Sequence, residues 1–466
     1  MIRRVTVIVA ALVAATAHHA PAAEAAAPGV QAHLLWSGVS SAEVNRELDD
    51  IAAIGADYVR VDVGWSSLEA DGRGQISTWY RDKLDHLVSA ANQRGIELIL
   101  TFWETPCWAS SAPDSLKQDC MGSWWDRGVQ RYAPRDPADY ARALAMVVER
   151  YGNRVAAWEV WNEPNHPDYL KGDNQVADYA AILRAAYPAA KAANPGPRIL
   201  GGSLADSDFE FTEALLDRGI KDSFDAWAIH PYSEDRSPLD PGPDQYVKHS
   251  FIRGIPAVRR ALVQHDAAAP LWLTEFGWST CNVRDRPEAY KNCVSEAQQA
   301  AYLEQAFRQM KEWAYVSVGV WFNSQDTTSD RSDKSRNFGL KRFDGSRKPA
   351  YSSFRAIATG RDSGAAGSDG GLPKLTLDAS ARSRGIRARG QSAAGTVLVR
   401  LYRYRRSRDG YASKPRHRVK AATDSAGAYN RLVAGNHLRR GRWKVLASAK
   451  VGGDSVKRRD VVRWRR

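Results

Sequence analysis

The sequence contains little cysteine and methionine and has no long apolar run after its first residues. It holds four cysteines and four methionines in 466 residues, and beyond the N-terminus nothing approaches the roughly 20 apolar residues that span a bilayer as a helix. Walker-type and EF-hand loops, CxxC pairs and HExxH motifs are absent from the sequence. The glycine-rich segment 364–371 follows no predicted strand, so it is not a dinucleotide-binding loop. We therefore expect no membrane span, no metal and no cofactor.

The first 25 residues have the three parts of a secretory signal peptide. Arg3 and Arg4 supply positive charge, residues 5–16 are apolar, and Ala-Glu-Ala at 23–25 is a small-x-small cleavage site. This pattern predicts a secreted protein, either extracellular or associated with a cell wall. An uncleaved anchor is the alternative, which the shortness of the apolar stretch disfavours.

The four cysteines fall in two close pairs along the sequence. Export places them in an oxidising compartment, where disulfides form and persist. We predict the bonds Cys107–Cys120 and Cys281–Cys293, each bracing a surface loop and restricting the unfolded chain. A zinc site is the alternative, but neither pair has CxxC spacing and no HExxH motif lies near them.

Short β-branched and aromatic runs alternate with amphipathic stretches of helical length along residues 30–359. This alternation is typical of repeated βα units. Eight such units predict an α/β fold, a (β/α)8 TIM barrel whose functional residues lie where the strands end. The eight strands are expected at residues 33–37, 57–63, 97–102, 156–161, 198–202, 226–230, 271–276 and 316–322.

A change of composition separates this barrel, the expected catalytic domain, from a smaller C-terminal domain. Residues 360–373 are rich in Gly, Ser, Ala and Asp, which is typical of a flexible linker. Residues 374–466 contain runs that alternate apolar and polar side chains between turn signals. Such runs predict a small β-sandwich.

Positive charge is concentrated in the C-terminal domain. Residues 372–466 hold 26 Lys and Arg against 5 Asp and Glu, a formal charge of +21, whereas the whole chain carries +13. Such a charge attracts polyanions. For an exported protein we expect an anionic polysaccharide or cell-wall polymer as the partner, and no nucleic acid, so that this domain holds the barrel near its substrate. The alternative is a solvated β-domain whose arginines reflect composition alone.

Two predicted strands end in carboxylates surrounded by aromatic residues. The fourth leads into Glu163 in Trp-Glu-Val-Trp-Asn-Glu-Pro-Asn (158–165), and the seventh carries Glu275 in Leu-Thr-Glu-Phe-Gly-Trp (273–278). A carboxylate at the carboxyl end of a barrel strand, with no Lys or Arg beside it, favours catalysis over a structural ion pair. Retaining glycoside hydrolysis needs two such groups about 5 to 5.5 Å apart, one as acid/base and one as nucleophile.

These motifs resemble those of the clan A glycoside hydrolases, retaining barrel enzymes with one glutamate on strand four and one on strand seven. The resemblance covers residues 34–358 and is nearest to families 5 and 39, of the cellulase or β-xylosidase type. Shorter matches support it: Thr-Pro-Cys-Trp-Ala (105–109), His-Pro-Tyr (230–232), Phe-Gly-Leu (338–340) and Lys-Pro-Ala-Tyr (348–351). It implies a secreted β-glycosidase that needs only two carboxylates and water.

The resemblance also implies a role for each matching position. Glu163 is the expected acid/base and Glu275 the expected nucleophile, while Asn162 hydrogen-bonds the 2-hydroxyl of the sugar. Arg60 is expected near Glu275, where a cation favours the ionised carboxylate. Tyr232 is expected to orient Glu275.

Further residues are expected to line the substrate site. His230 lies on the same wall as Tyr232, with a buried core histidine as the alternative. Trp321 at the end of the eighth strand is the expected platform under the sugar, because an indole buries the apolar face of a sugar ring, and Trp278 is a second aromatic at a strand end. Glu104 follows the third strand, where these families often have another residue. An extra carboxylate there would bind a cationic or hydroxyl-rich group.

Two other functions share these sequence features. A non-hydrolytic carbohydrate-binding or cell-wall-binding protein would keep the barrel without turnover, which the presence of both glutamates argues against. A transglycosylase would form the same covalent intermediate and pass it to a sugar instead of water. We expect a monomeric hydrolase that acts on a β-linked polysaccharide or oligosaccharide, with glucans, mannans, xylosides and uronic-acid sugars all open as substrates.

Overall fold

The structure of the protein is a computed structural model. It describes residues 26–284 and 292–360 and, in the C-terminal part, residues 378–382, 385–391, 396–405, 410–411, 416–422, 428–434, 441–451 and 454–464. The predicted signal peptide of residues 1–25 lies outside the described residues, as does the predicted linker apart from residue 360.

Eight parallel strands close into a barrel in which each strand pairs with the next one along the chain and β8 pairs with β1. The closed barrel confirms the predicted TIM-barrel class. Its strands are β1 (Ala27–Gln31), β2 (Tyr58–Gly64), β3 (Glu97–Trp103), β4 (Ala157–Val160), β5 (Arg198–Ala205), β6 (Ala226–His230), β7 (Leu271–Phe276) and β8 (Val316–Trp321).

The first predicted strand is wrong. β1 ends at Gln31, and the apolar residues at 33–37 belong to the turn region that follows it. Pro28 and Gly29 make this strand hard to predict, because both residue types are depleted in strands. Packing explains the glycine: a Cβ on Gly29 would lie 3.0 Å from Tyr58 Cβ and 3.0 Å from Val320 Cγ2. The strands on either side of β1 therefore approach a bare backbone at this position.

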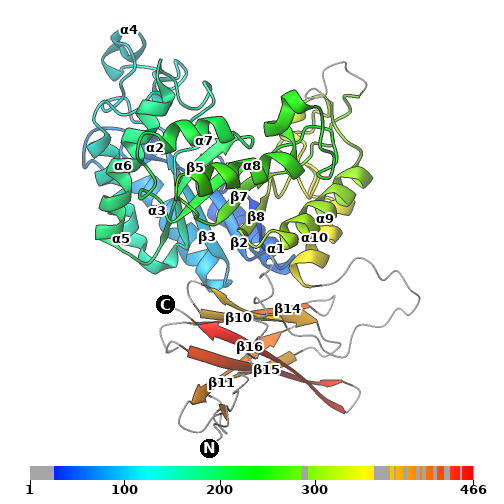
Figure 1. Cartoon of the computed structure of the whole chain (residues 1–466). Coiled ribbons are helices and arrows are strands. Elements are labelled where there is room, and N and C mark those ends of the chain that lie inside the picture. Colours follow the sequence, from blue (N-terminus) through cyan, green and yellow to red (C-terminus); the bar gives the residue numbers. More distant parts are fainter. Residues whose placement is uncertain are drawn as a thin grey trace, which may run out of the picture.

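Helices surround the barrel and cover its outer face (Figure 1). They are α1 (Ser41–Ala53), α2 (Trp65–Leu68), α3 (Thr78–Gln93), α4 (Asp114–Lys117), α5 (Pro137–Tyr151), α6 (Gln175–Ala193), α7 (Phe209–Leu216), α8 (Phe251–Gln264), α9 (Glu296–Glu312) and α10 (Pro349–Ala358). Helix α5 shows how local sequence sets the bounds: Asp136 accepts a hydrogen bond from the backbone N–H of Ala138, and Pro137 starts the helix. Within the part of the chain that the structure describes, no helix combines the length and apolar character needed to cross a membrane.

The C-terminal strands form two antiparallel sheets, which confirms the predicted small β-sandwich. One sheet has the order β14-β10-β9, and the other has the order β12-β11-β15-β16 with β13 paired to β11. The strands are β9 (Asp378–Arg382), β10 (Gly385–Gln391), β11 (Thr396–Arg405), β12 (Gly410–Tyr411), β13 (His417–Ala422), β14 (Ala428–Ala434), β15 (Gly441–Val451) and β16 (Asp454–Trp464).

A buried arginine joins the sandwich to the base of the barrel. Arg387 on β10 lies 3.4 Å from the Asp57 carboxylate and donates a hydrogen bond to the Gly95 carbonyl, with both ion-pair side chains almost fully buried. Asp57 and Gly95 precede β2 and β3, so this contact is at the amino ends of the strands. Figure 1 accordingly shows the sandwich on the side of the barrel away from α4.

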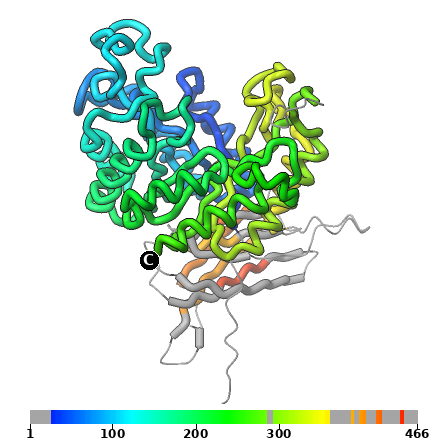
Figure 2. The backbone as a smooth tube through the Cα atoms, turned by 45° about the horizontal axis from the view of Figure 1, so that its top comes forward, coloured from blue at the N-terminus to red at the C-terminus, as the bar shows by residue number. Residues whose placement is uncertain are grey.

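Long connections leave the opposite, carboxyl ends of the strands. Figure 2 shows the segment after β3, in cyan, and the segments after β7 and β8, in green and yellow, projecting from the barrel on the side away from the sandwich. Functional residues of TIM barrels lie at this end of the strands. The two glutamates singled out in the sequence belong to this face.

Candidate active site

The chain turns sharply after β4 and brings Glu163 over the end of the barrel. Trp161 and Glu163 both have left-handed backbone conformations, with φ of 68° and 44°, which non-glycine residues seldom adopt outside functional sites. The backbone N–H of Glu163 donates a 2.8 Å hydrogen bond to the Ser203 carbonyl at the end of β5. The strained turn is therefore held by the neighbouring strand.

Glu163 and Glu275 face each other across the barrel end, with His230 between them. A carboxylate oxygen of each glutamate and one ring nitrogen of His230 all lie within 4.8 Å of one another. Glu163 and Glu275 keep 13% and 11% of their side-chain surface exposed, whereas His230 is fully buried. The structure thus brings together the two carboxylates predicted from separate strands, and leaves both accessible.

Glu275 is held by two fixed donors. Arg60 Nη1 donates to Glu275 Oε1 at 2.5 Å, and the Tyr232 hydroxyl donates to Glu275 Oε2 at 2.8 Å. The positions predicted for Arg60 and Tyr232 beside Glu275 therefore agree with the structure. Both contacts fix the direction in which the carboxylate points.

Arg60 is a fully buried centre of hydrogen bonds and does not reach the surface of the site. Besides Glu275, it donates to Glu159 Oε2 at 2.6 Å, to Asn162 Oδ1 at 2.8 Å and to Gln31 Oε1 at 3.0 Å. Burial alone would lower the pKa of Arg60, but the carboxylates of Glu159 and Glu275 outweigh it and raise that pKa. Arg60 was expected among the substrate-binding residues, and its burial makes it a positioning residue instead.

His230 contacts the opposite glutamate. Its Nδ1 lies 2.8 Å from Glu163 Oε1, and its Nε2 lies 3.4 Å from the Ser203 hydroxyl. Burial raises the pKa of Glu163, with a smaller contribution from the Glu275 charge, while His230 acts in the opposite direction. Burial alone would lower the pKa of His230, but the two carboxylates reverse this and raise it. His230 was expected among the substrate-binding residues, but in the structure it contacts Glu163 and has no exposed surface.

The two predicted tryptophans do not line the site. Trp321 has no exposed surface and its Nε1 donates to the Phe338 carbonyl, while Trp278 is 1% exposed and packs 6.0 Å from Trp321, centroid to centroid. A ring without exposed surface cannot stack on a sugar, so both assignments are wrong. Phe322, the next residue along the chain, is partly exposed, and its ring lies 6.2 Å from that of Tyr232.

Several residues of the site were missed by the sequence reasoning. Glu159 and Gln31 are buried partners of Arg60, and Phe322 lies next to Tyr232. The signal for Glu159 is its place four residues before Glu163 within a strand, where alternation of side chains directs it into the barrel. Gln31 was missed because β1 itself was misplaced.

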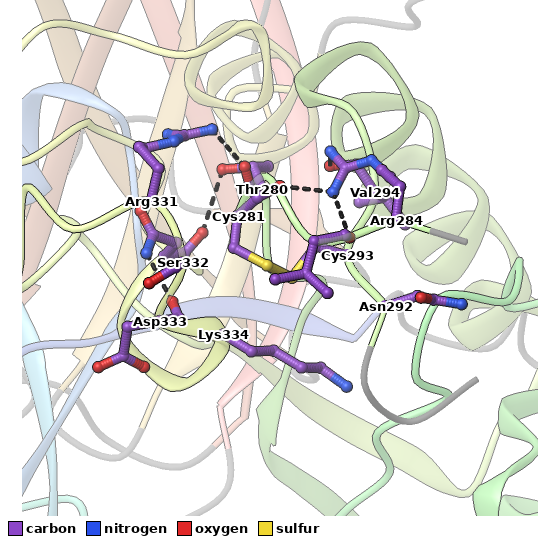
Figure 3. Close-up of a disulfide and its surroundings, with 12 residues drawn as sticks. Thr280, Cys281, Arg284, Asn292, Cys293, Val294, Arg331, Ser332, Asp333 and Lys334 are labelled. Carbon is purple, nitrogen blue, oxygen red and sulfur yellow. Dashed lines mark hydrogen bonds between the residues drawn. A yellow bond between two sulfur atoms is a disulfide. The ribbon is translucent and has the colours of Figure 1, made fainter. Parts of the chain in front are cut away.

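Both predicted disulfides are present, at Cys107–Cys120 and Cys281–Cys293. The second bond closes the segment that follows β7, directly after Glu275 and its strand (Figure 3). Around it, Arg284 donates to the Val294 carbonyl at 2.6 Å, and Arg331 from the segment after β8 donates to the Thr280 carbonyl. The disulfide and Arg284 brace the segment after β7, and Arg331 links it to the segment after β8.

The structure is a closed parallel barrel with two partly exposed carboxylates at the ends of strands four and seven, one of them held by a buried arginine. This arrangement defines a barrel protein with a pair of facing carboxylates in its site. Comparison with known families agrees with this description, because the family model described as cellulase, glycosyl hydrolase family 5, matches residues 18–326. The chain belongs to glycosyl hydrolase family 5. The resemblance to clan A seen in the sequence is thereby confirmed.

Solved structures share the fold of this chain, and curated relatives match part of its sequence. A family 39 glycoside hydrolase from Bacteroides cellulosilyticus is 21% identical with a TM-score of 0.56, over 87% of this chain and 79% of that one. A family 39 enzyme from Xanthomonas axonopodis is 17% identical with a TM-score of 0.53, over 89% and 92%. A coniferin β-glucosidase of Pinus contorta is 27% identical over 126 residues, 26% of this chain. The matched segment spans about a fifth of the length of the curated relatives, 22% and 20%.

Proposed function

We propose that the protein is a secreted, retaining β-glycosidase that hydrolyses a β-linked polysaccharide or oligosaccharide, with Glu163 as acid/base and Glu275 as nucleophile. The observation that carries the proposal is the separation of the two carboxylates, at most 4.8 Å between their nearest oxygens. Retaining enzymes have carboxyl groups about 5 to 5.5 Å apart, whereas inverting enzymes need about 6.5 to 9.5 Å for a water molecule. Membership of family 5 supports the same class of reaction.

The reaction proceeds in two displacements. In the first, a Glu275 oxygen forms a bond to the anomeric carbon while the glycosidic C–O bond breaks, and Glu163 gives its proton to the departing oxygen. In the second, Glu163 takes a proton from water, the water oxygen attacks the anomeric carbon, and the bond to Glu275 breaks. Glu163 is protonated again and Glu275 is ionised again, so the cycle closes.

The surroundings of the two glutamates support this division of roles. Burial raises the pKa of Glu163, which keeps a proton available for donation. Glu275 accepts hydrogen bonds from Arg60 and Tyr232, which hold the carboxylate in one orientation for attack. Asn162 is 6% exposed and its Oδ1 is engaged by Arg60, which leaves its amide N–H groups for a sugar hydroxyl.

Sugar release from β-glucan, mannan, xylan and uronic-acid polymers tests the proposal. We expect release from at least one polymer, and the lengths of the products will show whether cleavage is internal or terminal. Absence of release from all four, together with tight retention on one of them, would favour a binding protein. Secretion is supported by the predicted signal peptide and by the two disulfides, and is tested by the N-terminal sequence of the protein recovered outside cells.

Replacing His230 is expected to move the alkaline limb of the pH profile to higher pH. Glu163 must carry a proton in the first displacement, so kcat/KM falls as pH rises through its pKa. His230 lowers the pKa of Glu163 through a hydrogen bond and its charge. In His230→Leu that influence is lost, the pKa of Glu163 rises and the limb shifts upward. The control is His265→Leu, which removes a partly exposed histidine paired with Asp217. An unchanged or lowered limb in His230→Leu would contradict the assignment.

We also propose that the basic C-terminal domain binds an anionic polymer, such as a cell-wall polysaccharide. Arg418 and Lys420 are exposed, and their spacing of two residues along β13 puts them on one face of the strand, which the exposed Arg416 directly precedes. The domain cannot simply be deleted as a test, because Arg387 on β10 packs on the barrel.

Charge reversal on β13 is therefore the better experiment. Arg418→Glu with Lys420→Glu should elute from immobilised polygalacturonate at clearly lower salt than the parent. The control, Arg46→Glu with Lys221→Glu, makes the same change of net charge at exposed positions of the barrel. Equal losses of retention in both pairs would refute a specific binding face on the domain.

A further inference from the structure

Two carboxyl groups beside the catalytic residues have no part in the mechanism above. Asp62 lies on β2, two residues after Arg60, and Glu104 directly follows β3, the strand paired with β2. Both side chains are partly exposed at the same end of the barrel as Glu275. The Glu104 carboxyl group lies against Gly64, which follows Asp62 by two residues on the same face of β2, so the two carboxyl groups are on one side of the barrel end.

The position of Glu104 is built into the backbone. Its φ of 69° is left-handed, which is costly for a glutamate. The Ser66 hydroxyl donates to Glu104 Oε2 at 3.1 Å. A Cβ on Gly64 would lie 2.9 Å from the same oxygen, so the carboxyl group rests against a glycine that has no side chain to displace it. A solvated surface glutamate would need none of these features.

Asp62 belongs to the hydrogen-bond network of the nucleophile. Gln31 donates through Nε2 to Asp62 Oδ2 at 3.0 Å, and the Oε1 of the same glutamine accepts from Arg60. Arg60 in turn donates to Glu275. Asp62 is therefore fixed relative to the attacking oxygen through two side chains.

Both carboxyl groups retain unused hydrogen-bonding capacity. Within the described residues, Asp62 Oδ1 and Glu104 Oε1 accept no hydrogen bond from the protein, and neither group forms an ion pair with a lysine or arginine. A third polar atom nearby is also unsatisfied: the Nδ1 of His33 is buried without a partner. The His33 ring stacks at 4.2 Å on Trp36, which is 53% exposed. The two partly exposed carboxyl groups and the unpartnered Nδ1 of His33 can therefore bond a ligand at this end of the barrel.

We infer that Asp62 and Glu104 determine the sugar specificity of the site, accepting hydrogen bonds from hydroxyls of a neutral sugar and excluding uronic-acid sugars. Two carboxyl groups with free oxygens suit hydroxyl donors, whereas the carboxylate of a uronic acid would meet the negative charge that the pair carries. This inference rests on the proposed glycosidase function and narrows its substrate class.

The charge state of the pair favours a neutral sugar over a cationic one. Burial raises the pKa of Glu104 to about 8, and burial also raises the pKa of Asp62. At neutral pH Glu104 is therefore largely protonated, and the pair carries at most about one negative charge. A carboxyl group and a carboxylate side by side offer one donor and several acceptors, which matches adjacent sugar hydroxyls.

The test compares tetrasaccharides that differ only at C6. Cellotetraose and mannotetraose are paired with the β-1,4-linked tetramers of glucuronic and mannuronic acid, and glucosamine tetramer is added as the cationic probe. We expect the parent protein to hydrolyse a neutral member in preference to its uronic-acid counterpart. In Asp62→Asn the ratio of kcat/KM for neutral over acidic substrate should fall by roughly tenfold or more, mainly through KM, because a like-charge contact is removed. Glu104→Gln replaces a largely protonated carboxyl group, so it should act by raising KM for the neutral substrate and thereby lower the same ratio.

Further variants separate this role from a structural one. Gly64→Ala displaces the Glu104 carboxyl group without changing its charge, and should weaken binding of the neutral tetrasaccharide. Asp82→Asn removes an exposed carboxylate on α3 and should leave the ratio unchanged. Each variant's free energy of unfolding is measured by chemical denaturation, so that a loss of folding is recognised.

Binding is measured in parallel by calorimetry, which does not depend on turnover, with each substitution made in the inactive Glu275→Gln background. Any of three results would overturn the inference. The first is a preference for the uronic-acid or glucosamine tetramer, and the second is an unchanged kcat/KM ratio in both Asp62→Asn and Glu104→Gln. The third is the absence of binding of a neutral tetramer. If hydrolysis requires Glu275 but the ratio of kcat/KM for neutral over acidic substrate is unchanged in both variants, the proposed function stands and the specificity inference fails. Binding that depends on Asp62 and Glu104 without any hydrolysis would reject the proposed function and retain the specificity.

Discussion

Glu275→Gln is expected to lower kcat by on the order of 10⁴-fold or more, the range found when an enzyme loses its covalent nucleophile. The substitution keeps the size of the side chain and one acceptor for the Tyr232 hydroxyl, so substrate binding should change little. Activity is measured with an aryl β-glycoside and with the polymer that gives the best sugar release. A residual kcat above about a hundredth of the parent value would mean that another group attacks the anomeric carbon.

Replacing Glu163 should lower activity by an amount that depends on the leaving group of the substrate. Loss of an acid catalyst costs about 10²- to 10⁴-fold when the leaving group needs a proton. Glu163→Ala should therefore be slow on polymers but should form the covalent intermediate readily from a dinitrophenyl glycoside, whose leaving group departs without protonation. Azide should then attack that intermediate and yield a β-glycosyl azide. Equal losses on both kinds of substrate would contradict the role of Glu163 as proton donor.

Arg60→Met is expected to lower the free energy of unfolding by about 3 to 5 kcal/mol, the usual cost of removing one partner from a buried ion pair. It leaves Glu159 fully buried and Glu275 mostly buried, without the guanidinium that serves both. The loss in free energy of unfolding should be largest at neutral pH. In the parent protein, burial would raise the pKa of Glu159, but Arg60 lowers it. Without Arg60 the effect of burial dominates, so the pKa of Glu159 in the folded state exceeds its value in the unfolded state. Protonation of Glu159 at acidic pH then removes the buried charge and relieves the loss of stability.

Chemical denaturation across pH measures this effect. Adding Glu159→Gln to Arg60→Met should restore part of the stability at neutral pH, because one uncompensated charge is removed, while activity stays low. Arg60→Lys is the conservative control: it keeps the charge but cannot donate to Glu159, Glu275 and Asn162 at once. An Arg60→Met protein as stable as the parent at pH 7 would show that the buried network contributes little to the fold.

Periodicity allowed most of the barrel to be predicted from the sequence, because buried strands and amphipathic helices repeat with different periods. β6 and β7 lie at the residues expected. β1 escaped because Pro28 and Gly29 resemble a turn, and only packing against β2 and β8 makes them part of a strand.

The catalytic pair was predictable because each glutamate stands in a distinctive motif at a strand end. The orientation of neighbouring side chains was not, since it depends on where each strand stops. Trp321 and Phe322 are adjacent, and successive residues point to opposite sides: the tryptophan turns into the packing beside Phe276, while the phenylalanine lies beside Tyr232. Burial of Arg60 and His230 likewise follows from the closed barrel and not from their own motifs.

The anomeric configuration of the first product tests the central claim most directly. Proton NMR of a β-linked substrate during the first minutes of hydrolysis distinguishes the two anomers before they equilibrate. Double displacement through Glu163 and Glu275 predicts that the β-anomer appears first and the α-anomer later, by mutarotation. Initial release of the α-anomer would show single displacement by water, and would contradict the assignment of Glu275 as the nucleophile.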